Sequence, residues 1–307
     1  MLFRSRACHS VPTIGGAGPR DVNVMRHGII AGDGRFLAPD IGTIIPKEVV
    51  VSGSRAEPQP GVNIFEHRQT PHNFGLGLID LISEETITAH SDPEDLDGDG
   101  ISGRPHILTD GRIGRFGWKA QVPSLAEFVR DASGAELGLS SEPQAGLTFG
   151  RLEDDDAVAD PELSLGMLED LTFFLTMLGP PPRQPIVSAT LVSAGEALFE
   201  RVGCAKCHIP AMNSAIGPVP LYSDLLLHEI LRPDAKGIED GSAGMREFRT
   251  APLWGLSQTT PYFHSGEADT IDQAIRLHDG EAAAMRQRYE ALSETDRVAL
   301  LAFLGSL

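Results

Sequence analysis

Two cysteines and a histidine, Cys204, Cys207 and His208, follow one another in the pattern Cys-x-x-Cys-His. Two thiols on one turn of chain can form thioether bonds with the two vinyl groups of a porphyrin, and the adjacent imidazole then reaches the iron from one face. We call these three residues the C-terminal motif. They predict a covalently attached c-type haem with His208 as the proximal iron ligand, and hence redox chemistry.

Two other kinds of site use paired cysteines, and both fit this sequence less well. A zinc ribbon needs a second pair of ligands, which the only other cysteine, Cys8, cannot provide. A thioredoxin-type redox pair belongs to a βαβ setting, and strand-like alternation is scarce here. Haem attachment is therefore the interpretation that the motif favours.

A shorter pattern near the start of the chain, Cys8 and His9, resembles the end of a second such motif, and we call it the N-terminal motif. Ser5 occupies the place of the missing first cysteine, so only one thioether bond could form. His9 could still bind iron, because axial ligation does not require both covalent links. From these residues alone, a second haem and an exposed Cys-His pair both remain open.

Composition and charge restrict the partners of the protein. The chain has 307 residues and a formal net charge of -18 at pH 7. Such a chain would repel phosphate backbones, and no Lys/Arg-rich run compensates locally, so we expect no nucleic acid partner. We also expect no membrane span, because no segment approaches the roughly 20 apolar residues that one requires. The most apolar stretch, 163–178, is interrupted by Glu169 and Asp170.

The haem motif also bears on where the protein works. Covalent haem attachment in bacteria normally takes place outside the cytoplasm, so we expect a periplasmic protein. Residues 1–14 contain two arginines but no apolar core of a signal peptide. We therefore expect that the chain starts late, either truncated or from a misassigned initiator.

The elements that must position these motifs are expected to be mainly α-helical. Periodicity and capping residues predict helices at 74–83, 125–131, 160–178, 193–201, 270–277 and from Ser293 onwards. Roughly the first 75 residues are rich in glycine, proline and turn signals, which indicates a loop-rich wrap. The proline-rich segment 179–185 is the expected linker between an N-terminal domain, 1–178, and a cytochrome c-like C-terminal domain, 186–307.

Beyond the haem motif, the sequence resembles the bacterial di-haem oxidoreductases often called thiol oxidoreductases, which are related to di-haem cytochrome c peroxidases. The matching segments follow the family order along nearly the whole chain: 7–16, 74–79, 97–105, 114–120, 222–228, 247–256 and 261–266. The resemblance implies a second haem at the N-terminal motif, inside a peroxidase-like N-terminal domain. It also implies that a C-terminal haem passes electrons to this N-terminal haem, where the chemistry occurs.

In that arrangement the electron-transfer iron needs two protein ligands, whereas the reactive iron must keep one position open. The resemblance places an axial methionine near Met245, although a methionine in a loop can equally be plain packing. His264 is expected either to bind iron or to hydrogen-bond a propionate or a loop carbonyl. His228 and His278 are further candidates for this ligand, but both follow helical apolar runs and are expected rather to be structural histidines.

The resemblance also implies two catalytic residues. Glu136 falls about where related peroxidases carry a glutamate that moves a proton between the two peroxide oxygens. Phe128 stands where those enzymes usually have a glutamine, and this departure leaves the peroxide geometry open. Trp118 would lie between the haems and conduct electrons. The alternatives are a solvated surface carboxylate for Glu136 and a core side chain for Trp118.

An acidic, glycine-rich stretch matches the first half of a calcium loop, with Asp95, Asp97 and Asp99 at positions 1, 3 and 5. His106 stands at position 12 in place of the usual glutamate, so another residue such as Asp110 would have to complete the site. Related peroxidases hold calcium between their haems. The alternative is an acidic turn stabilised by its own side-chain to backbone hydrogen bonds.

Together these features predict an enzyme, a di-haem oxidoreductase that is peroxidase-like or acts on thiols. Its expected partners are an electron-donor protein, such as a small cytochrome or a cupredoxin, and a small-molecule oxidant or thiol. The acidic surface suits a small substrate or a basic protein partner. The alternative is a non-enzymatic electron carrier with one working haem at His208, which the serine at position 5 favours.

Overall fold

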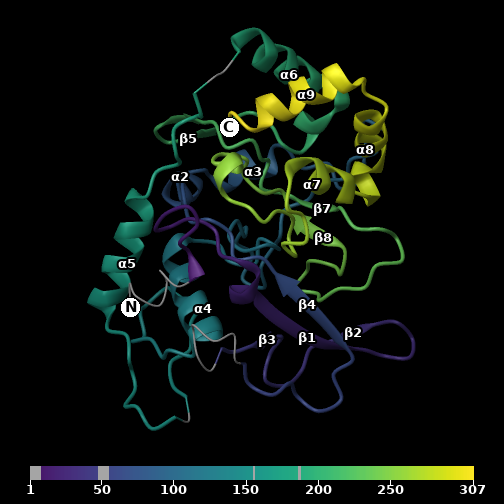
Figure 1. Cartoon of the computed structure of the whole chain (residues 1–307). Coiled ribbons are helices and arrows are strands. Elements are labelled where there is room, and N and C mark those ends of the chain that lie inside the picture. The colour runs from purple at the N-terminus through teal and green to yellow at the C-terminus, as the bar shows by residue number, and fades with distance from the viewer. Residues whose placement is uncertain (1–7, 48–54, 155, 186–187) are drawn as a thin grey trace.

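The computed structural model describes residues 8–47, 55–154, 156–185 and 188–307 (Figure 1). Helices account for 31% of the structure and strands for 16%, and long irregular segments connect short elements. The expectation of a mainly α fold is therefore wrong. No helix in the described part of the chain is long and apolar enough to cross a bilayer.

A small antiparallel sheet in the N-terminal part accounts for much of this difference. Its strands are β1 (Val24–Ile30), β2 (Phe36–Leu37), β3 (Ile44–Ile45) and β4 (Ile64–Arg68). β1 pairs with the other three, and its longest pairing joins Val24 to Arg68, far apart in sequence. Two polar residues of β1, Arg26 and His27, are buried, so the alternation that marks a half-buried strand is missing. The sequence therefore indicates a loop-rich wrap where the structure has a sheet.

Four helices follow in the N-terminal part: α2 (Leu76–Asp80), α3 (Glu84–Thr88), α4 (Leu125–Leu137) and α5 (Leu165–Met177). α2 and α4 confirm the helices expected at 74–83 and 125–131, although α4 continues for two more turns. α5 begins later than expected, because Ser164 rather than Asp160 caps it by accepting a hydrogen bond from the backbone N–H of Met167.

The C-terminal part contains the helices α6 (Ala189–Val202), α7 (Ile271–Leu277), α8 (Ala283–Glu290) and α9 (Glu294–Leu304). Thr270 and Gln273 form the predicted capping box of α7, and Ser293 caps α9 as predicted. α6 starts after Ser188, one turn before the expected position. Short strands and 3-10 turns connect the helices: β5 (Met212–Ser214), β6 (Gly217–Val219), β7 (Leu227–Glu229), β8 (Glu247–Arg249), η2 (Cys204–Lys206), η3 (Leu256–Gln258) and η4 (Gly280–Ala282), while η1 (Arg20–Val22) precedes β1.

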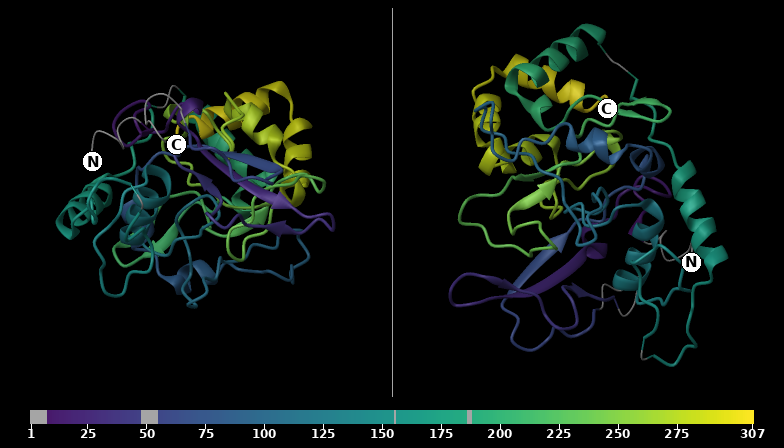
Figure 2. Two further views of the ribbon diagram at one scale, coloured as in Figure 1. Left: turned by 90° about the horizontal axis from the view of Figure 1, so that it is seen from below. Right: turned by 180° about the vertical axis from the view of Figure 1, so that it is seen from behind.

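α6 and α9 pack together at the end of the molecule opposite the sheet (Figures 1 and 2). Gly195 allows this close crossing, because a side chain there would collide with the backbone of Ala299. Phe199, Tyr222 and Phe303 form an aromatic cluster beneath the two helices. The packing fixes the end of α6, from which the C-terminal motif begins.

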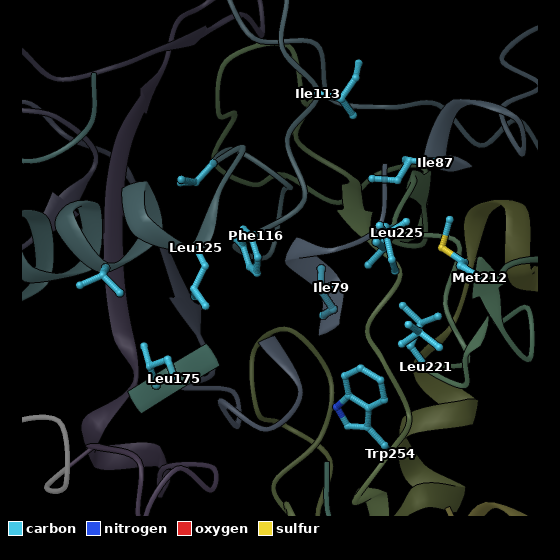
Figure 3. Close-up of a cluster of buried hydrophobic side chains, with 14 of the residues drawn as sticks. Ile79, Ile87, Ile113, Phe116, Leu125, Leu175, Met212, Leu221, Leu225 and Trp254 are labelled. Atoms are coloured by element: carbon cyan, nitrogen blue, oxygen red, sulfur yellow. The ribbon is translucent and has the colours of Figure 1, made fainter. Parts of the chain in front are cut away.

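The largest hydrophobic core cluster draws residues from both sides of the segment 179–185. Ile79, Phe116 and Leu125 precede this segment, whereas Leu221 and Trp254 follow it (Figure 3). The Trp254 side chain also donates a hydrogen bond to the backbone carbonyl of Phe74, at 3.0 Å. The boundary at 179–185 stays a prediction, and the two parts that it separates share a core.

Candidate haem-binding cavity

α6 delivers the C-terminal motif through a sharp turn. The helix ends at Gly203, whose φ of 100° lies in the left-handed region that favours glycine. The backbone N–H of His208 then donates to the carbonyl of Cys204, at 3.0 Å, and closes a single turn. Cys204 and Cys207 lie on this turn as free thiols. This is the arrangement that two thioether bonds to one porphyrin require.

His208 is oriented to bind a metal through its other ring nitrogen. Its Nδ1 lies 2.9 Å from the carbonyl oxygen of Tyr222, and fixing one nitrogen on a backbone carbonyl leaves Nε2 as the ligand atom. Burial lowers the pKa of His208 to about 4. The imidazole is therefore neutral near pH 7, which is the form that binds iron.

A cavity of about 280 Å³ lies beside this motif and extends into the N-terminal part of the molecule. The C-terminal motif lines it together with Phe199 and Met285, and residues from the N-terminal part such as His72, Phe74 and Ile79 complete its wall. We call this space the haem cavity. Its largely apolar wall, with two free thiols and a neutral imidazole at the C-terminal motif, fits a haem there.

Trp118 and Arg249 also line the haem cavity. The Trp118 indole N–H donates to the carbonyl of Gln69, at 2.7 Å, and the Trp118 carbonyl accepts from the backbone N–H of Arg249, at 2.8 Å. Trp118 therefore joins a segment of the N-terminal part to one of the C-terminal part. The half-buried Arg249 guanidinium supplies a positive charge, which is the kind of group that binds a haem propionate.

The N-terminal motif lies beside the haem cavity. Cys8 is buried with its sulfur 3.6 Å from the Lys47 Nζ, and His9 Nδ1 lies 2.8 Å from the carbonyl oxygen of Pro71. Pro71 lines the cavity, whereas neither residue of the motif is among the described residues of its wall. Ser5, the third position that bears on this motif, lies outside the described residues. The Pro71 carbonyl holds one ring nitrogen of His9, as a backbone carbonyl often does for a metal-binding imidazole.

His72 is a second imidazole near the N-terminal motif, and no sequence pattern singles it out. Its Nδ1 is buried without a hydrogen-bond partner among the described residues, and its ring stacks on that of Phe74. Burial, followed by the proximity of His9, lowers the pKa of His72 to about 4. A neutral imidazole on the cavity wall can bind iron or accept a hydrogen bond from a substrate. The only signal in the sequence is its place just before the matching segment 74–79.

Glu136 lies in the last turn of α4, near Cys8, but is not among the described residues of the cavity wall. Burial raises the pKa of Glu136 to about 7; the charge of Lys47 lowers this pKa and the charge of Asp131 raises it. A carboxyl group that titrates near neutrality can both accept and return a proton. Phe128 lies on the same helix and does line the cavity.

Met245 and His264, two of the four residues considered as second ligands of the C-terminal iron, differ in position. Met245 is not among the described residues of the cavity wall, and its carbonyl accepts a hydrogen bond from the buried Lys119 Nζ. His264 does line the cavity, with its ring 3.9 Å from that of Phe248 between centroids. Its Nδ1 is buried and has no partner within the described residues. Ligation by either residue stays a prediction.

Two further histidines, His228 and His278, line the haem cavity. His228 has both ring nitrogens engaged, with Nε2 2.9 Å from Asp224 and Nδ1 3.0 Å from Glu281. Against the effect of burial, the neighbouring carboxylate of Asp224 raises the pKa of His228 well above its ordinary value. His228 is thus a buried cation. In His278 only Nδ1 is engaged, 2.8 Å from the carbonyl oxygen of Ala274.

The acidic loop gathers a different set of carboxylates from the one that the calcium pattern predicts. Asp95 and Asp97 lie with Asp92, with carboxylate oxygens all within 4.8 Å of one another. Asp99 instead forms an ion pair with Lys206 of the C-terminal motif segment, at 2.5 Å. Backbone N–H groups of the loop also bond to these carboxylates, as the alternative expects. Calcium binding stays a prediction.

Asp110, the residue expected to complete that calcium loop, and His106, which stands at its position 12, both have other partners. Asp110 forms an ion pair with Arg112, at 2.7 Å. His106 Nδ1 lies 2.6 Å from the carbonyl oxygen of Lys119. Neither is found in the group of carboxylates around Asp95.

Comparison with known proteins decides the family. Residues 59–307 match the family described as "Di-haem oxidoreductase, putative peroxidase". The chain belongs to this di-haem oxidoreductase family. The resemblance noted in the sequence is thereby confirmed. The matched range includes the C-terminal motif and most residues of the haem cavity, and it begins after the N-terminal motif.

Individual relatives of this di-haem oxidoreductase match it more distantly. Cytochrome-c peroxidase IdrP2 of Pseudomonas sp. (strain SCT) is 29% identical over 146 residues, which cover 37% of this chain and 38% of that protein. The chain thus spans well under half of that relative. Kuenenia stuttgartiensis hydrazine synthase aligns over 79% of this chain and 73% of its own, with a TM-score of 0.45 and 16% identity. A MauG-like protein associated with microbial copper homeostasis aligns over 75% and 91%, with a TM-score of 0.40 and 15% identity.

Proposed function

We propose that this di-haem oxidoreductase transfers electrons from a haem at the C-terminal motif to a haem at the N-terminal motif, where peroxide is reduced. If the substrate is instead a thiol that is oxidised at the N-terminal haem, its electrons would leave in the opposite direction, through the C-terminal haem to a protein acceptor. One observation carries the proposal. The haem cavity extends from Cys204, Cys207 and His208 to Pro71, which holds His9 through its carbonyl group. A single apolar space thus approaches both motifs.

The residues of the chain would divide the work as follows. The two thiols of the C-terminal motif anchor the porphyrin, and His208 Nε2 binds the iron. Arg249 neutralises a propionate, and the Trp118 ring stands on the cavity wall between segments from both parts of the chain. When bound, haem supplies a reversible one-electron couple and, where an axial position is open, a site for a small oxidant.

Glu136 is the group that we assign to proton transfer at the N-terminal motif. Its carboxyl has a pKa of about 7 and lies close enough to Cys8 that its charge raises the pKa of that thiol further, after burial. Peroxide cleavage needs a base that takes a proton from one oxygen and returns it to the other. A carboxyl group poised near neutrality suits both halves of that transfer.

The electron donor and the compartment follow from charge and from haem chemistry. The net charge of -18 favours a donor with a basic surface, such as a small cytochrome or a cupredoxin. Covalent haem attachment favours the periplasm. Both assignments are part of the proposal.

A second candidate is a non-enzymatic electron carrier with one haem at the C-terminal motif. Three observations favour it: Ser5 replaces a cysteine, the N-terminal motif lies beside the cavity wall, and the family match begins at residue 59. In that case the cavity near His72 would hold no haem. The two candidates differ in the number of haems per chain.

A haem count on chain matured by a c-type cytochrome assembly system tests the proposal. Two haems per chain in a pyridine haemochrome assay, one with the spectrum of a single thioether, are expected. Cys8→Ala should weaken only the N-terminal attachment, and Cys204→Ala with Cys207→Ala only the C-terminal one. One haem per chain, together with no peroxide-dependent oxidation of a reduced cytochrome, would support the carrier instead.

Calcium binding by Asp95, Asp97 and Asp99 is tested separately. Isothermal titration of the holoprotein with calcium should show binding that Asp97→Ala removes. Asp110→Ala is the matched control, because Asp110 is paired with Arg112. Heat of binding that persists in Asp97→Ala would place the ion elsewhere.

A further inference from the structure

We propose that His278 is the second protein ligand of the C-terminal iron, alongside His208. The inference rests on the proposed C-terminal haem and selects a candidate that the sequence favours as a structural histidine. It replaces Met245 as the ligand that makes this haem an electron-transfer centre. Three observations support it: the position of His278 on the cavity wall, the hydrogen bonding of its ring, and the contacts that hold its backbone and ring in place.

Position comes first. Five histidines line the haem cavity: His72, His208, His228, His264 and His278. His208 and His278 both lie on the wall of this one cavity. Met245, by contrast, is not among the described residues of the wall.

Hydrogen bonding separates His278 from the other histidines. A haem-ligating imidazole generally donates one N–H to a carbonyl or carboxylate and binds iron through the other nitrogen. His278 has this pattern, since Nδ1 lies 2.8 Å from the Ala274 oxygen and Nε2 has no partner among the described residues. His208 shows the same pattern with Tyr222, at 2.9 Å.

The remaining three histidines of the cavity lack this pattern. His228 has carboxylates on both nitrogens, so neither is left for iron. The Nδ1 atoms of His72 and His264 are buried without a partner in the described part of the chain. Nothing fixes the tautomer of those two rings. Only His208 and His278 therefore form a matched pair.

The backbone around His278 is held on both sides. The residue follows α7, which starts at a full capping box, and its own N–H donates to the carbonyl of Ile275. The next residue, Asp279, donates its N–H to the carbonyl of Ile230, which also lines the cavity, at 2.9 Å. Phe263 packs edge to face against the His278 ring. A ligand held in this way is placed by the fold before the haem arrives.

Ligation by two imidazoles has consequences that differ from ligation by histidine and methionine. Both make the ferric iron six-coordinate and low-spin, but a methionine ligand raises the reduction potential. The C-terminal haem of this protein should therefore have the lower potential of a bis-histidine centre. Its ferric spectrum should also lack the far-red charge-transfer band of methionine-ligated haem.

The test uses the ferric holoprotein and electron paramagnetic resonance, near-infrared magnetic circular dichroism and redox titration. His278→Ala should convert one low-spin haem per chain to high-spin. His278→Met should keep that haem low-spin, produce the methionine charge-transfer band and raise its potential. Met245→Leu and His264→Gln are the matched controls and should leave the spin state and the bis-histidine band unchanged.

Each outcome decides between specific alternatives. Loss of the low-spin signal in Met245→Leu, or its survival in His278→Ala with intact haem content, would overturn the inference. If His278→Ala does not fold, His278→Met still tests the inference. A folded His278→Met variant that lacks the methionine charge-transfer band would also overturn ligation by His278. A protein with no haem at Cys204 and Cys207 would instead refute the proposed function.

Discussion

The two motifs differ in how completely the chain prepares them. At the C-terminal motif, one turn after α6 presents both thiols, and His208 is already fixed by Tyr222 beside an apolar cavity. At the N-terminal motif, Cys8 is buried against Lys47, and His9 is fixed by Pro71 but lies beside the wall. The comparison teaches that a local pattern can fix the anchors of a cofactor, while its walls and second ligands come from distant segments.

The strongest test of this difference between the motifs removes the two thiols of the C-terminal motif, and we expect it to have the largest effect. Cys204→Ala combined with Cys207→Ala removes both thioether bonds, so the variant should keep no covalent haem at that end. Peroxide-dependent turnover should then fall to background, because the path from the donor is cut. Haem staining of a denaturing gel measures the attachment.

Cys8→Ala is the control for this prediction and should retain the C-terminal haem. Covalent haem that survives in the double variant at the level of the parent would contradict the role of the two thiols. The C-terminal motif would then be no better prepared to attach haem than the N-terminal motif.

Glu136→Gln tests whether the N-terminal motif is the reactive one. Turnover should fall about 10²- to 10⁴-fold, the usual contribution of a general acid–base group. Because the pKa of Glu136 is about 7 and the carboxylate is the base, the activity of the parent should decline as the pH falls below about 7. The variant should lose this pH dependence. Steady-state rates from pH 5 to pH 9, as rough limits, would check it.

Glu153→Gln, at an exposed carboxylate, is the matched control for that experiment. Equal rates in Glu136→Gln and the parent would remove Glu136 as the proton carrier. They would also direct attention to His72 on the cavity wall.

His228→Gln should destabilise the fold by about 3–5 kcal/mol, because the buried Asp224 and the half-buried Glu281 would lose their cationic partner. The neighbouring carboxylate raises the pKa of His228 above 6.5 in the folded state, despite burial. The stabilisation is therefore fully present below pH 6.5 and is lost as the pH rises through the folded pKa. Denaturant unfolding should show a difference in the free energy of unfolding between parent and variant that becomes smaller at alkaline pH. A difference that grows with pH would show that His228 is neutral in the fold.

Trp118→Phe should have the smallest effect on stability, about 1 kcal/mol, because it removes one hydrogen bond, to the Gln69 carbonyl. It keeps an aromatic ring but not the indole, so electron transfer between the haems should slow while both haems remain. Stopped-flow reduction followed at the two Soret bands would measure this. Unchanged transfer would make Trp118 a packing residue, with Trp254→Phe as the control for a core tryptophan.

The helices that follow local signals could be predicted from the sequence, and the sheet could not. The capping box of Thr270 and Gln273 acts within one turn and marks the start of α7 without help from the rest of the chain. The pairing of Val24 with Arg68 depends on residues far apart. The buried Arg26 further hides the strand, because its charge is compensated by Asp240 from the C-terminal part.

The same distinction applies to the site. Cys204, Cys207 and His208 are visible because thioether chemistry requires them at fixed spacing. His72 is not visible, and His278 is favoured only as a structural histidine, because each is an isolated histidine until folding brings it to the cavity. A sequence shows which imidazoles exist, but not which of them has a carbonyl on one nitrogen and open space at the other.

The core cluster that joins Ile79 and Phe116 to Leu221 and Trp254 has a consequence for electron transfer. Side chains from before and after the proline-rich segment interlock, so a hinge motion there would expose this hydrophobic surface to water. In the proposed di-haem arrangement, the fold would therefore fix the separation of the two redox centres. Electrons would tunnel over a distance set by packing, and the rate would not wait for the two halves to approach each other.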